Sequence, residues 1–132
     1  MAWLKIIVQE IIEQFHVYES NESSLFDRML GYVQSNYAKD LNLKTIASEF
    51  HNNPAYLGQL FKKETGQSFT SYLNSIRVQK AKELLINSKL KINEVSEKVG
   101  YFNVNYFYTV FKKLTGFSVM EFKDRKSSFK IL

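Results

Sequence analysis

The chain has 132 residues, of which 45% are hydrophobic, enough for one compact domain or for two small units that share an element. It contains no Cys, which excludes disulfides and thiolate metal sites, and its single Pro and five Gly disfavour a turn-rich β fold. Residues 1–40 carry three Lys or Arg and six Asp or Glu, whereas residues 41–132 carry fifteen and seven, which indicates either a polyanionic partner for the second part or a lysine-rich surface covered only by water.

Residues 1–24 are predicted to form an upstream helix followed by a loop. Apolar residues recur three and four positions apart over 4–15, which is typical of an amphipathic helix, and residues 18–24 are polar. The apolar stretch is too short to span a bilayer, and no secretory cleavage site follows it. These features predict a soluble, cytoplasmic protein.

The region from 25 to 132 is predicted to be one all-α domain. A helix is expected over about Leu25 to Tyr37, and a break follows it at 36–42. Everything beyond the break has helical periodicity with short polar connections, and no segment alternates as a strand would.

An internal repeat is the most informative feature of this region. The segment FKKETG at 61–66 recurs as FKKLTG at 111–116, a shift of 50 positions. Further upstream the shift becomes 49, so that Ile46 and Phe50 match Val95 and Val99, and the second copy has one extra residue in its turn. Five identities in six positions indicate one structural unit used twice.

Each copy is predicted to be a helix-turn-helix unit, over about 43–66 and 92–116. A small residue, Ala47 or Ser96, stands where the first helix of the pair would cross the second. An Asn before the second helix and a Gly after it have the positions of a cap and a stop: Asn53, Gly66, Asn103 and Gly116. Inward-facing positions on the second helices are predicted for Leu57, Leu60, Phe61, Phe107, Val110, Phe111 and Leu114.

A long central helix, about 71–86, is predicted to join the two units. Apolar residues from Leu73 to Leu85 supply its buried side. A helix of that length spans roughly 24 Å, and successive major grooves of B-DNA lie about 34 Å apart. The two second helices are therefore expected to reach adjacent groove segments of one duplex.

Three segments of this region resemble a known family. The pattern NPxYLxxLFKKxxG at 53–66, RxxKAxxLL at 77–85 and VGYxNxxYFxxxFKKxxG at 99–116 is similar to the DNA-binding domain of AraC/XylS-type transcription regulators, and the similarity runs from 41 to 122. The resemblance implies seven helices, two helix-turn-helix units and sequence-specific binding to double-stranded promoter DNA. It also implies RNA polymerase as a partner, an upstream sensory or receiver domain in the same longer chain, and a possible dimer through that part. Activation and repression both stay open.

The chain departs from the family pattern at three positions. Gln59 and Thr109 stand where the family often has Arg, and Val119 stands where Pro is usual. The base preference of the family therefore does not carry over. Without Arg on either reading face, we expect weak guanine readout and a preference for A·T-rich sites.

The predicted contacts with DNA fall into two groups. The first group is expected to meet bases in the major groove: Ala55, Gly58, Gln59, Val104, Asn105 and Thr109. The second is expected to meet the sugar–phosphate backbone: Asn53, Lys62, Lys63, Arg77, Asn103, Tyr108, Lys112 and Lys113.

The sequence also bears on other functions, namely catalysis, single-strand binding and protein interaction. His16 and His51 have no partner at ligand spacing, and no nucleophile motif or phosphate loop occurs, so neither an enzyme, a cofactor nor a metal is predicted. The 11 Phe and 8 Tyr residues mostly fall on inner faces, which favours a core over single-strand stacking. A helical protein-interaction module stays open as the alternative.

Overall fold

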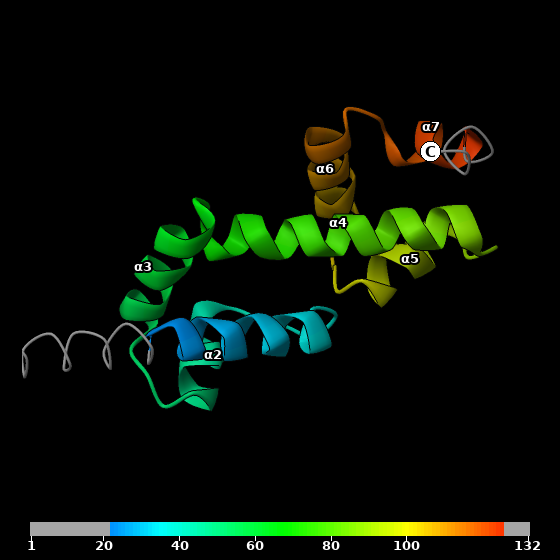
Figure 1. Cartoon of the computed structure of the whole chain (residues 1–132). Helices are drawn as coiled ribbons and strands as arrows, with labels where there is room; N and C mark the ends of the chain where they lie inside the picture. Colours follow the sequence, from blue (N-terminus) through cyan, green and yellow to red (C-terminus); the bar gives the residue numbers. More distant parts are fainter. Residues whose placement is uncertain (1–21, 126–132) are drawn as a thin grey trace, which may run out of the picture.

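The computed structural model describes residues 22–125, and in this range it contains helices and no strands. The first helix covers residues 22–36. None of the described helices combines the length and the apolar character needed to cross a bilayer. The remaining helices follow in order (Figure 1): α2 (Leu43–Glu49), α3 (Pro54–Thr65), α4 (Phe69–Asn87), α5 (Ile92–Lys98), α6 (Val104–Thr115) and α7 (Val119–Asp124).

The predicted all-α fold with two helix-turn-helix units on a long central helix is confirmed, with small changes at the helix ends. Residues 22–24, predicted as loop, are already helical. The central helix begins two residues early, because the Ser68 hydroxyl caps it by accepting a hydrogen bond from the Ser71 amide at 3.1 Å. The predicted helix at 4–15 lies outside the described residues.

The helices enclose two separate hydrophobic cores. The first core joins the helix at 22–36 to α2, α3 and the start of α4, with Met29, Ile46 and Phe61 fully buried. The second joins the end of α4 to α5, α6 and α7, with Val95 and Phe107 fully buried. Each helix-turn-helix unit therefore has a core of its own.

α4 belongs to both cores because its apolar residues change sides halfway along. Phe69 and Leu73 pack in the first core, whereas Val78, Ala81 and Leu85 pack in the second. At 100° per residue, the centres of these two stripes lie about 130° apart around the helix axis. In Figure 1, α4 accordingly runs as a rod, with α3 at its first end and α6 meeting it near its middle.

One inward-facing prediction is wrong. Leu114 was expected on the buried face of α6, but its side chain is 45% exposed. Phe107, Val110 and Phe111 already fill that face. Leu114 follows Phe111 by three residues, and it is not among the residues that pack in the second core.

Gly100 lies where the turn of the second unit approaches the turn that follows the first helix. Its φ is +106°, and a Cβ atom there would lie 2.9 Å from the Tyr37 carbonyl oxygen and 3.1 Å from Ala38 Cα. Gly116, at φ +81°, has nothing within 4 Å of its Cβ position. A substitution at Gly116 therefore tests backbone strain alone, whereas one at Gly100 tests strain together with a steric clash.

We expect Gly116→Ala to lower the free energy of unfolding by about 1–2 kcal/mol, through the strain of a left-handed backbone alone. Gly100→Ala should cost at least about 3 kcal/mol, because overpacking against a rigid backbone adds to that strain. Urea denaturation followed by circular dichroism measures both. Equal losses in the two variants would contradict a close contact at Gly100.

Candidate nucleic-acid interface

The turns of the two helix-turn-helix units are built in the same way. The Asn52 amide donates a hydrogen bond to the Ala47 carbonyl at 2.9 Å, and the Tyr101 amide donates to the Ser96 carbonyl at the same distance. Ala47 and Ser96 are buried, so a small side chain lies under each turn. The repeat seen in the sequence is therefore a repeat in three dimensions.

The predicted caps hold the start of both second helices. Asn53 Oδ1 accepts hydrogen bonds from the second and third amides of α3 at 2.8 and 3.3 Å. Asn103 Oδ1 does the same on α6, at 2.9 and 3.3 Å. Gly66 and Gly116 end these helices in the left-handed conformation, as predicted.

Matching positions of α3 and α6 form the exposed faces of the two units. Ala55 and Gln59 on α3 correspond to Asn105 and Thr109 on α6, and all four are exposed. The Thr109 hydroxyl donates to the Asn105 carbonyl at 3.1 Å, which orients it along its own helix. Each face ends in two exposed lysines: Lys62 and Lys63 on α3, Lys112 and Lys113 on α6.

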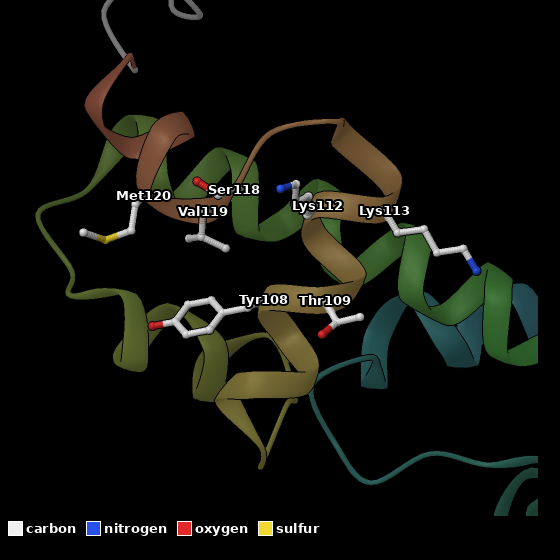
Figure 2. A pocket seen from close by; sticks show the side chains of 7 residues that line it. All are labelled: Tyr108, Thr109, Lys112, Lys113, Ser118, Val119 and Met120. Carbon is white, nitrogen blue, oxygen red and sulfur yellow. The ribbon is translucent and has the colours of Figure 1, made fainter.

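The face of α6 borders a hollow on the surface. It lies between α6 and the start of α7 and has a volume of about 600 Å³. Its floor is mostly apolar, and two lysines stand at its side. Figure 2 shows the side chains that line it, which are Tyr108, Thr109, Lys112, Lys113, Ser118, Val119 and Met120. Four predicted contact residues, Tyr108, Thr109, Lys112 and Lys113, therefore share one concave surface.

Two residues predicted to meet bases face the protein instead. Gly58 points at α2, where a Cβ atom would lie 3.0 Å from Leu43 Cδ1, so its small size serves the helix crossing. Val104 is half-buried and packs against the second core. Neither belongs to the exposed faces of α3 and α6.

Arg77, which was predicted to contact phosphate, is buried within the protein. Its side chain is 8% exposed, and it donates hydrogen bonds to the carbonyls of Tyr37 and Lys39, both at 2.8 Å. The guanidinium also lies 5.2 Å from the centre of the Tyr101 ring. Burial lowers the pKa of Arg77, while Tyr101 and Asp40 oppose that change. A sequence motif cannot separate an exposed Arg from one that is buried between distant segments.

The hydroxyl of Tyr101 is held by a hydrogen bond to a residue of α4. It donates to Asn74 Oδ1 at 2.6 Å, and Asn74 Nδ2 in turn donates to the Tyr106 hydroxyl at 3.2 Å. Burial raises the pKa of Tyr101, and nearby Arg77 only partly offsets this. Tyr101 therefore stays a neutral donor, and it ties α4 to the start of α6.

On the first unit, Glu22 holds the exposed face of α3 to the first helix. Its carboxylate accepts a hydrogen bond from the Tyr56 hydroxyl at 3.0 Å and pairs with Lys63 at 3.2 Å. The Lys63 side chain nevertheless remains 66% exposed. Lys63, a predicted phosphate contact, therefore lies at the surface and forms an ion pair within the protein.

Phe102 is a surface residue that the sequence reasoning missed. It is 85% exposed and stands directly before the cap of α6. The repeat shift changes from 49 to 50 between the turn and the cap, so Phe102 is the extra residue of the second copy. That change of shift was the signal in the sequence.

Comparison with known proteins identifies what this arrangement is similar to. The profile of a family described as helix-turn-helix domain matches residues 46–125. The HTH-type transcriptional regulator YijO of Escherichia coli is 36% identical over 109 residues, which cover 83% of this chain and 38% of that protein. The xylose operon regulatory protein of the same organism is 30% identical, over 73% of this chain and 24% of that protein.

Solved structures have the same fold. The C-terminal domain of AraT, a response regulator from Geobacillus stearothermophilus, superposes with a TM-score of 0.72 at 38% identity, over 74% of this chain and 82% of that one. The DNA-binding domain of AdpA, solved in complex with a target DNA, has a TM-score of 0.73 over 77% of this chain and 92% of that one. Its 18% identity shows the fold alone.

The capping residues contribute to the stability of the fold, whereas the exposed faces do not. We expect Asn103→Ala to lower the free energy of unfolding by about 1 kcal/mol, because two amides of α6 lose their acceptor. The control is Asn105→Ala, two residues further along, which should stay within about 0.5 kcal/mol because its exposed side chain caps nothing. Urea unfolding of both variants is the measurement, and a larger loss at Asn105 would reverse the assigned roles.

Proposed function

The chain belongs to the AraC/XylS-type family of DNA-binding transcription regulators, and we propose that it binds as a monomer to two adjacent major-groove segments of one duplex. α3 would read one segment and α6 the other. The chain spans 38% and 14% of the first two curated relatives that it matches. The activity and partners of the whole regulator therefore belong to the proposal.

The observation that carries this proposal is the matched pair of exposed helix faces on one shared helix. α4 has 19 residues and a length of about 28 Å, which is close to the separation of about 34 Å between successive major grooves. Each unit has its own core, so each second helix keeps its exposed face independently of the other.

Base recognition is assigned to the positions at which the two faces differ. Gln59 and Asn105 have the amide geometry for two hydrogen bonds to adenine, and Ala55 suits a thymine methyl group. Thr109 is the further candidate on α6. With these residues and no Arg on either face, the preferred sites should be rich in A·T pairs.

Backbone binding is assigned to the positions that the two faces share. Lys62, Lys63, Lys112 and Lys113 would neutralise phosphates, and four such contacts predict a slope of log K against log salt of about −3.6. Tyr108 and the two capping residues, Asn53 and Asn103, complete the proposed backbone contacts. These contacts would set affinity and register rather than sequence preference.

The wider setting follows from the family. We place the protein in the cytoplasm with the chromosome, working through binding alone and without catalysis. The length of the relatives supports an upstream sensory or receiver domain in the same regulator, through which it could dimerise. RNA polymerase is the proposed protein partner at the promoter.

Selection of sites from a random duplex pool, followed by gel-shift titration, tests the proposal. Gln59→Ala should weaken the selected site by about 1–3 kcal/mol and relax the preference at one position. Lys62→Ala should weaken all sequences alike and reduce the salt slope by about 1. Both side chains are exposed, so neither change should disturb the fold.

The results of these titrations distinguish base reading from backbone binding. Equal losses on every sequence for both variants would contradict base reading by Gln59. No binding of the parent protein to any duplex would instead favour a helical protein-interaction module.

A further inference from the structure

The two units, each taken here as a helix-turn-helix pair together with the segments that share its core, touch directly beside α4. The turn after the first helix, at 37–39, lies against the turn of the second unit at Gly100. A Cβ atom on Gly100 would lie 2.9 Å from the Tyr37 carbonyl oxygen and 3.0 Å from Arg77 Nε. One residue of α4, Arg77, therefore meets both units at the same point.

Arg77 uses different chemistry towards each unit. Towards the first unit it donates two hydrogen bonds, from Nε to the Tyr37 carbonyl and from Nη2 to the Lys39 carbonyl, both at 2.8 Å. Towards the second unit its guanidinium lies over the Tyr101 ring, 5.2 Å from the ring centre. The planar fork of Arg suits two acceptors and a ring face together, whereas the compact ammonium of Lys does not.

This contact is buried as well as bonded. Arg77 is 8% exposed and Tyr101 is 3% exposed. A buried cation is costly unless its donors find acceptors, and the two carbonyls provide them. If the units pivoted about α4, these bonds would break and leave the cation and both carbonyls without partners. The contact therefore opposes any such rotation.

We propose that Arg77 is a positioning residue that locks the two helix-turn-helix units into one rigid body, so that the protein accepts only one separation between its two groove segments. The DNA consequence rests on the proposed function, whereas the lock is a property of the protein alone. Separate experiments therefore test the two parts.

The first experiment measures the distance between the units without DNA. Because the chain has no Cys, Glu49→Cys on α2 and Glu97→Cys on α5 give one exposed label site in each unit. Pulsed electron paramagnetic resonance should show one narrow distance distribution for the parent. Arg77→Ala and Arg77→Lys should broaden it by about twofold or more.

A control on the same helix separates the lock from a simple loss of charge. Within residues 22–125, Lys80 forms an ion pair with Glu83, three positions along α4, and its side chain is 45% exposed. Lys80→Ala should keep the narrow distribution of the parent. Circular dichroism shows which variants are folded.

Each result decides the proposal. If Arg77→Ala does not fold, Arg77→Lys is the deciding variant. A folded Arg77→Lys protein with the parent's narrow distribution would overturn the lock. If neither variant folds, Arg77 holds the fold itself rather than the relation between the units, and the proposal is equally wrong.

The second experiment measures tolerance of spacing on DNA. One or two base pairs are inserted between the two halves of a selected site, which rotates one half by roughly 35° per base pair. The parent should lose about tenfold or more in affinity, and Arg77→Lys less than about threefold, with similar affinity of both proteins for a single half-site. Equal loss in both proteins would overturn the lock while DNA binding stood. If the parent bound no duplex, the proposed function would fail. The distances between the two spin labels would still show whether Arg77 locks the two units.

Discussion

The structure depends on how α4 divides its apolar residues between two cores. Phe69 and Leu73 complete the first core, and Val78, Ala81 and Leu85 begin the second. Hydrophobic burial therefore holds both helix-turn-helix units to one rigid rod, on sides about 130° apart. In the repeat, the first half of α4 corresponds to α7, because Ser68 and Ser118 cap their helices in the same way. The same helix ends one unit and begins the next.

The repeat separates what the two units share from what distinguishes them. Buried positions match, with Phe61 and Phe111 in the two cores and Ala47 and Ser96 under the two turns. The paired lysines at the ends of α3 and α6 match as well. Between the caps and the lysines, the exposed residues Ala55 and Gln59 of α3 differ in kind from Asn105 and Thr109 of α6. This is the pattern expected if both units grip a phosphate backbone in the same way and read different bases.

Much of this could be predicted from the sequence because the signals are local. Helical periodicity, an Asn before each second helix and a Gly after it depend on neighbours within four residues. The exposed side chains of Gln59, Asn105 and the lysines follow from the same periodicity. Errors arose where packing, rather than periodicity, decides what a side chain faces. Gly58 meets Leu43 across the helix pair, and Leu114 was counted into a face that Phe111 already fills.

The sequence by itself determined the helices, their caps, the repeat and the family. Only the tertiary structure decided how the two units are held relative to each other. That relation depends on Arg77, whose acceptors at Tyr37 and Lys39 lie about forty residues earlier in the chain, and on Gly100, which leaves room for the first of them. No periodicity records such a contact, because its free energy comes from burying a cation only where carbonyls and a ring from separate segments converge.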